Sequence, residues 1–180
     1  SILGSMSFGY QRTFYVDITG RNDISSTLPD ENNSYFYPSA TASYIFSEGM
    51  DSDVLSFGKL RFGWAQVGND TDPYQLNQTF SVRGQGYLGL TTVEASPVRL
   101  NADLKPETIT SSEFGLELGL LNNKLTLDLS IYNMSTKDLI FDVPVPAATG
   151  FAFSRDNIGE VTNKGVEIAL GASVLNTDNF

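Results

Sequence analysis

Apolar and polar residues alternate along much of the chain. From residue 113 to 120, Phe and Leu fall on every second position, with Glu or Gly between them, and the alternation resumes from residue 125 to 132. Successive side chains of a strand point to opposite faces of a sheet, so this period of two predicts β-strands. The paired Asn122 and Asn123 between the segments suit a tight turn. The region therefore predicts a hairpin with one apolar and one polar face.

Similar alternation predicts further strands at residues 2–10, 14–21, 38–46, 55–66 and 165–172. Each arm of the hairpin approaches the roughly 9–11 residues that a tilted strand needs to cross a bilayer. Strands of globular proteins usually have only about 5–6 residues. Length therefore favours the wall of a membrane β-barrel, apolar toward lipid and polar toward a lumen. A soluble antiparallel sheet also has one apolar and one polar face, so a soluble β-sandwich is the alternative.

The predicted connections differ in length. Short or moderate connections at residues 11–13, 49–52 and 122–123 alternate with long ones at residues 22–34, 67–112 and 134–163. In outer-membrane barrels the periplasmic turns are short and the external loops are long. The alternation predicts antiparallel up-and-down strands of a large transmembrane barrel, with the three long loops external. We also expect residues 139–143 to extend the sheet above the membrane.

Composition excludes several classes of function. The 180 residues contain 11 Lys and Arg against 21 Asp and Glu, for a net charge of -10. Nucleic acid is not an expected partner, because no basic stripe is present to neutralise phosphates. The absence of Cys and His removes thiolate metal sites and also the commonest general base and zinc ligand. No catalytic set emerges, and we expect a protein that is not an enzyme.

Several segments, taken in order, resemble one known family. They are GRNDISSTLP (residues 20–29), SYFYPS (34–39), GKLR (58–61) with QVGN (66–69), LKPET (104–108) and NIGEVTNKGVE (157–167). Together they resemble the barrel of SusC/RagA-type TonB-dependent transporters, and the resemblance covers most of the chain.

The resemblance implies a plugged barrel of about 22 strands in the outer membrane of a Gram-negative bacterium. It implies import of oligosaccharides or peptides by gated passage, energised through TonB, with a SusD-like surface lipoprotein and membrane lipid as partners and no cofactor. Residues 1–180 would form part of this barrel, and the plug domain, the TonB box and the remaining strands are expected outside them. Two alternatives stay open: a soluble β-sandwich adhesin or carbohydrate-binding module, and a passive porin.

Ionisable residues of the polar face are the candidate lumen-facing residues. We expect them to hydrate the lumen and to pair across strands or with the plug. They are Asp17, Arg21, Lys59, Arg61, Glu113, Glu117, Asp128 and Glu167.

Aromatic residues of the predicted external loops are candidates for contact with substrate or with the cap lipoprotein. Their faces can stack on sugar rings, and packing within the loops is the alternative role. They are Tyr35, Phe36, Tyr74, Tyr87, Phe151 and Phe153.

Asp70 and Asp72, with Asn69, offer the oxygen ligands that Ca²⁺ prefers. The segment lacks the Gly and the distal Glu of an EF-hand loop, and Pro73 indicates a turn. We therefore expect no metal site.

Overall fold

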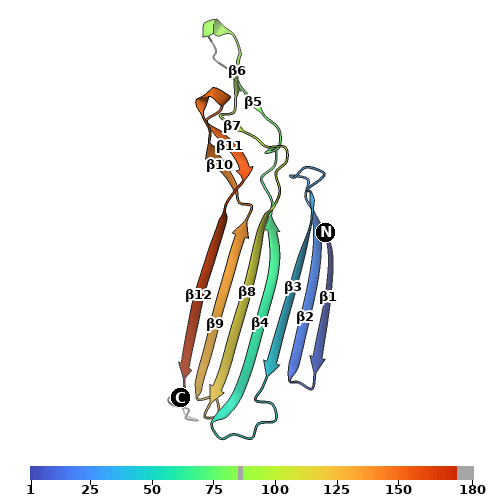
Figure 1. Cartoon of the computed structure of the whole chain (residues 1–180), viewed down its shortest axis with the longest axis vertical. Coiled ribbons are helices and arrows are strands. Elements are labelled where there is room, and N and C mark those ends of the chain that lie inside the picture. Colours follow the sequence, from blue (N-terminus) through green and yellow to red (C-terminus); the bar gives the residue numbers. More distant parts are fainter. Residues whose placement is uncertain (85–86, 174–180) are drawn as a thin grey trace.

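The computed structural model describes residues 1–84 and 87–173 and contains one large antiparallel sheet. Its seven strands pair in chain order, so that each main strand lies beside the next one in the sequence (Figure 1). The strands are β1 (Ile2–Tyr10), β2 (Phe14–Ile24), β3 (Ser34–Ile45), β4 (Leu55–Asn69), β8 (Glu107–Leu120), β9 (Leu125–Lys137) and β12 (Glu160–Ala172). The prediction of antiparallel up-and-down strands is confirmed.

Most strands are longer than the sequence pattern predicts, and every large extension lies at the same end of the sheet. β2 continues to Ile24, β4 continues to Asn69, and β8 begins at Glu107. Polar side chains occur on both faces here, as at the pair Asn69 and Glu107, and apolar ones such as Val67 and Ile109 no longer alternate regularly with them, while backbone pairing continues. The backbone ladder does not depend on side-chain polarity. The sheet therefore has an apolar band and, beyond it, a polar rim.

The connections fall into two groups at opposite ends of the sheet. Residues 11–13, 46–54 and 121–124 join strands at the lower end in Figure 1, and residues 25–33, 70–106 and 138–159 join them at the upper end. The predicted turn at Asn122 and Asn123 is confirmed, and both residues have positive φ, 56° and 59°. The predicted alternation of lengths is wrong for one pair, since the connections 25–33 and 46–54 are equally long.

The two longest upper connections contain secondary structure of their own. β10 (Ile140–Pro144), β11 (Phe153–Asn157) and β7 (Val98–Arg99) form a three-stranded sheet, and β5 (Phe80–Arg83) pairs with β6 (Thr92–Ala95). Two 3₁₀ turns, η1 (Tyr87–Gly89) and η2 (Ala147–Thr149), lie at loop tips. The expectation that residues 139–143 extend the main sheet is wrong: this segment is a strand, but it pairs with β11 in the separate sheet.

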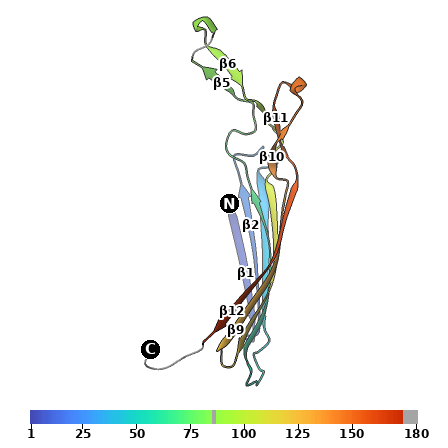
Figure 2. The same ribbon diagram turned by 90° about the vertical axis from the view of Figure 1, so that its left-hand side faces the viewer.

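The main sheet is a single layer. Figure 2 shows it edge-on as a thin, curved layer, and every pair of described strands in extensive contact consists of neighbours within one sheet. Among the described residues, the only buried hydrophobic side chains are Leu28 and Leu104, and both lie in the upper connections. No second sheet packs on the described strands, as a β-sandwich would require. Within residues 1–84 and 87–173, no helix is long and apolar enough to cross a membrane.

Candidate functional site: a charged face, an apolar face and a folded loop region

The candidate lumen-facing residues all lie on one face of the main sheet. Directly paired residues of neighbouring strands share a face, and the register places Lys59, Glu117 and Asp128 in one row across β4, β8 and β9. The other candidates follow the same parity in neighbouring rows: Asp17, Arg21, Arg61, Glu113 and Glu167. The structure confirms that these residues share a face, and their position toward a lumen stays a prediction.

Arg61 is the centre of a charged cluster on this face. Its Nη1 pairs with the Glu117 carboxylate, and its Nη2 donates to Asp128 Oδ1 at 2.6 Å and to Ser130 Oγ at 2.9 Å. Lys59 Nζ lies 3.5 Å from Glu117 Oε2. The cluster therefore links three strands through charge-assisted hydrogen bonds, which are stronger than neutral ones.

Two residues that the sequence did not single out shape this cluster. Ser130 is only 8% exposed, accepts from Arg61 and donates to Glu113 Oε1 at 3.4 Å. Gly115 leaves space for the Arg61 side chain, since a Cβ there would collide with Nε and Cγ of Arg61. The register reveals both, because Arg61, Gly115 and Ser130 occupy one cross-strand row.

The remaining polar-face candidates lie apart from the cluster. Asp17 accepts from Thr41 Oγ1 at 3.4 Å, and Arg21 pairs with Asp23 of its own strand at 2.7 Å. Glu167 lies on the terminal strand β12, opposite Ser130. The structure thus brings together Lys59, Arg61, Glu113, Glu117 and Asp128 of the candidate set.

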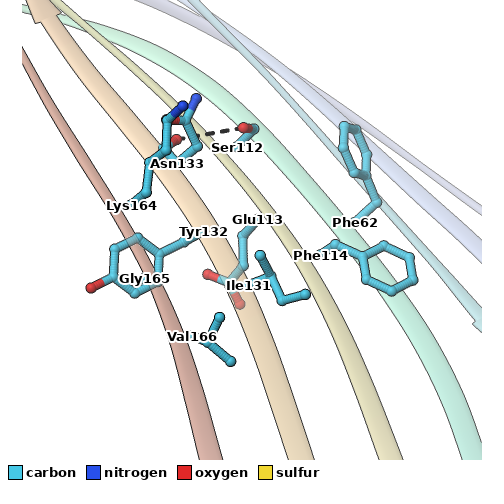
Figure 3. Close-up of a pocket in the computed structure, with 10 residues that line it drawn as sticks. All are labelled: Phe62, Ser112, Glu113, Phe114, Ile131, Tyr132, Asn133, Lys164, Gly165 and Val166. Atoms are coloured by element: carbon cyan, nitrogen blue, oxygen red, sulfur yellow. Dashed lines mark hydrogen bonds between the residues drawn. The ribbon is translucent and has the colours of Figure 1, made fainter.

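The opposite face of the main sheet is apolar and uncovered. Phe62, Phe114 and Ile131 stand side by side in one row, and each is 49% exposed. Figure 3 shows how these residues and Val166 follow one another across four strands. They line an open hollow of ≈ 570 Å³. Contact with water costs about 25 cal/mol per Å² of apolar surface. A surface of this extent therefore calls for an apolar environment or a partner.

The Tyr132 ring lies over Gly165 of the adjacent strand (Figure 3). A Cβ at position 165 would collide with the ring and the hydroxyl group of Tyr132. The glycine therefore lets the aromatic side chain lie flat against the charged face of the sheet, where Tyr132 pairs with Glu113.

The candidate aromatic residues are distributed over several upper segments. Tyr35 and Phe36 belong to β3 and not to a loop, which corrects the prediction for both. Tyr74 is 87% exposed, whereas Phe153 on β11 is 39% exposed. Phe151 is partly buried beside β11. The Tyr87 backbone lies in η1, and its side chain is outside the described part of the structure.

Asp70 fastens the connection 25–33 to the upper end of β4. Its Oδ2 accepts hydrogen bonds from Ser25 Oγ at 2.5 Å, Thr27 Oγ1 at 3.2 Å and Tyr35 Oη at 3.3 Å. These bonds, that of Ser25 foremost, hold the pKa of Asp70 below its usual value. Within the described residues, no three His, Cys, Asp or Glu side chains gather as a metal site would require.

Arg155 joins the two longest upper connections. It forms a two-pronged ion pair with Asp142, at 2.7 Å and 2.8 Å, and also donates to Gln75. The hydrogen bonds from Arg155 hold the pKa of Asp142 below its usual value. The guanidinium therefore connects β10 and β11 with the segment that follows β4.

Further polar contacts join the same two connections. Arg99 Nη2 donates to Ser154 Oγ at 3.0 Å, and Asn101 donates to Asp156 Oδ1 at 2.9 Å. The Asn157 side chain bonds the Lys105 backbone in both directions, at 2.8 Å each. Residues 70–106 and 138–159 thus form one folded loop region held mainly by polar contacts.

Comparisons with known proteins agree with this architecture. The family model described as "TonB dependent receptor-like, beta-barrel" matches residues 5–179. TonB-dependent receptor P26 of Formosa agariphila is 33% identical over 100% of this chain and 19% of its own length. TonB-dependent receptor SusC of Bacteroides thetaiotaomicron is 30% identical over 100% of this chain and 19% of its own.

Solved structures show the same fold. The RagAB peptide importer in its closed-closed state matches with a TM-score of 0.86 and 26% identity, over 98% of this chain and 20% of that chain. The siderophore receptor PirA of Pseudomonas aeruginosa matches with a TM-score of 0.62 at 16% identity, over 92% of this chain and 29% of that chain, which supports the fold alone. This chain spans about a fifth of the curated relatives it matches.

The family match covers nearly the whole chain, and the sheet has the antiparallel order that such a match requires. The family consists of transporters and not of enzymes, which agrees with the lack of a catalytic set in the sequence. The chain belongs to the TonB-dependent receptor β-barrel family.

Proposed function

We propose that residues 1–180 form part of the barrel wall of an outer-membrane, TonB-dependent importer of oligosaccharides or peptides. In this arrangement the apolar face contacts lipid and the charged face contacts the lumen. The observation that carries the proposal is the single-layer sheet, with an uncovered apolar face on one side and the Arg61 cluster on the other.

Strand length supports the proposed membrane position. β4 has 15 residues, which corresponds to about 50 Å at the usual rise of an extended strand. The hydrocarbon core of a bilayer is about 30 Å thick, and barrel strands cross it at a tilt. β4 is therefore long enough to cross the core and to raise the polar rim above it. The upper connections are then external and the lower connections periplasmic.

The charged cluster suits a water-filled lumen. Lys59 and Arg61 face Glu113, Glu117 and Asp128, so acidic groups outnumber basic ones on this part of the face. Hydrocarbon would not tolerate such a cluster, because a charged group at membrane depth is costly. We assign it the role of hydrating the lumen, joining neighbouring strands and offering ionic contacts to a plug.

The relatives support the proposed partners and cargo. One solved relative is named as the RagAB peptide importer, and a curated relative is the receptor SusC. We therefore propose energy supply through TonB, a SusD-like surface lipoprotein as the cap, and oligosaccharide or peptide as cargo.

The decisive experiment measures uptake by cells that carry the intact receptor containing this chain. Labelled oligosaccharides and peptides are offered to cells with and without TonB, and to cells without the receptor. We expect uptake to require both proteins. Uptake that persists without TonB would support the passive porin instead, and a protein that dissolves without detergent would support the soluble adhesin or carbohydrate-binding module.

A further inference from the structure

A pocket of ≈ 330 Å³ lies between two upper connections. One wall comes from the connection 25–33, and the other comes from the segment that follows β4. The lining residues are mostly neutral and able to form hydrogen bonds, and the others are apolar. They are Ser26, Thr27, Pro73, Tyr74, Leu76, Asn77 and Thr79.

The wall from the connection 25–33 is fixed in place. Thr27 Oγ1 donates to Asp70 at 3.2 Å, and the adjacent Leu28 is only 4% exposed. Ser25 bonds both Asp70, at 2.5 Å, and Thr27, at 2.7 Å. Burial of Leu28 and the bonds to Asp70 therefore hold the Thr27 hydroxyl group of this wall in one position.

The opposite wall is also held by its neighbours. Gln75 bonds Arg155, and Gln78 bonds the Ser96 carbonyl and the Leu100 amide at 3.4 Å each. Both glutamines alternate along the chain with residues that line the pocket. The second wall is thereby joined to the folded loop region, so the pocket has two supported sides.

Tyr74 has an unusual position in this second wall. Its φ is 65°, in the left-handed region that non-glycine residues rarely adopt, and its side chain is 87% exposed. Pro73 and Tyr74 form a turn, and this turn accounts for the backbone conformation of Tyr74. The ring stands at the pocket as an accessible aromatic surface.

The chemistry of the walls selects one class of ligand. The hydroxyl groups of Ser26, Tyr74 and Thr79 and the Asn77 amide can bond a ligand rich in hydroxyl groups. Thr27 Oγ1 can accept from such a ligand, since its own hydrogen is donated to Asp70. The aromatic ring can stack on the C–H face of a sugar. Acidic ligands are disfavoured, because Asp70 bonds Thr27 of the wall and Asp72 precedes the lining residue Pro73. The volume lies near the lower end of the range for ligand pockets, which suits one or two sugar rings.

We propose that this pocket binds a neutral pyranose ring stacked on Tyr74, as an external subsite for oligosaccharide. The inference rests on the proposed import function and narrows its cargo to neutral sugars at this point of entry. A peptide would use charged groups or an open strand edge, which the lining residues of this pocket do not supply.

The test measures binding to the purified intact receptor in detergent by isothermal titration calorimetry. The probes are neutral gluco-, galacto- and manno-oligosaccharides of three to six units, with uronic acid oligosaccharides and uncharged peptides for comparison. Tyr74→Asn removes the ring yet tolerates the left-handed backbone, and Tyr74→Phe keeps the ring. Phe80→Ala is the matched control, since Phe80 is 65% exposed and lies outside the pocket.

We expect a neutral oligosaccharide to bind, and Tyr74→Asn should raise its Kd about tenfold. Tyr74→Phe should stay within about twofold of the unmodified receptor, and Phe80→Ala should bind as the unmodified receptor does. Equal binding by Tyr74→Asn, binding of acidic oligosaccharides or peptides alone, or no binding at all would overturn the subsite. TonB-dependent uptake by the same variants separates the two proposals: uptake that needs TonB but ignores Tyr74 leaves the import function standing and removes only the subsite.

Discussion

The main sheet and the upper loop region are stabilised by different means. Long ladders of backbone hydrogen bonds hold the strands of the sheet together. One apolar face of the sheet is uncovered, with Phe62 and Phe114 each half-exposed. The loop region buries Leu104 completely and joins its segments through side chains such as Arg155. A local alternating pattern specifies the sheet, whereas contacts between residues distant in sequence specify the loop region. The stability of the sheet should therefore depend on which face carries a charged side chain. The stability of the loop region should depend on single polar groups.

The strongest test of the two-faced sheet places a charge on each face at almost the same height. Leu118 and Leu127 face each other on the apolar side, and Thr126 lies on the other side. If the apolar face meets the middle of a bilayer, Leu118→Arg or Leu127→Arg should cost about 2–4 kcal/mol of folding free energy. Urea unfolding of the intact receptor in lipid vesicles measures the cost. Thr126→Arg is the control and should cost much less, and equal effects at the three positions would contradict the facing.

A second test asks whether the Arg61 cluster depends on the space at Gly115. A methyl group there collides with Arg61, so Gly115→Ala should displace the guanidinium from Glu117 and Asp128 and cost about 1–3 kcal/mol. Gly63→Ala is the matched control, because a Cβ at that glycine meets no atom within 4 Å. Its effect should stay within about 0.5 kcal/mol. The same urea titration compares both variants, and equal stability would show that Arg61 moves aside without cost.

The sheet could be predicted from the sequence because one rule operates over its whole apolar band. Parity correctly placed Lys59, Glu117 and Asp128 on a common face. It could not locate the ends of the strands, since the polar rim has no apolar alternation to reveal it. It also missed Ser130 and Gly115, which matter only once the register is known.

The structure of the loop region could not be predicted, because it depends on contacts between residues that are distant in the sequence. Its small sheet joins β7 to β11, and the contact between Arg99 and Ser154 spans 55 positions along the chain. Nothing in a local pattern distinguishes these residues from solvated loop residues. The sequence also could not separate the roles of the aromatic candidates. Tyr35 lies in a strand and donates a hydrogen bond to Asp70, whereas Tyr74 lines a pocket.

A smaller effect is expected where polar pairs hold the loop region. Arg155 and Asp142 form a two-pronged pair, so a double-mutant cycle with alanine should give a coupling energy of about 1 kcal/mol. Hydrogen exchange of the strand amides beside each pair in the intact receptor measures this local stability. The exposed pair Lys137 and Glu160, 3.9 Å apart, is the control and should show coupling near zero. Equal coupling in the two pairs would remove the proposed role of Arg155.

The smallest effect should be a local response of the connection 25–33 to acid. The folded-state pKa of Asp70 lies below its usual value because Ser25, Thr27 and Tyr35 bond the carboxylate. The stabilisation is therefore fully present above the usual pKa of an aspartate and is lost as the pH falls through the lower, folded-state value. The protection factors of the amides at residues 25–33, which are corrected for the intrinsic pH dependence of exchange, should fall over that acidic interval, while those of β4 stay high. Asp70→Asn should remove this pH dependence, because the amide does not titrate. If the variant kept it, another group would fasten the connection, and the supported wall beside Tyr74 would need a different explanation.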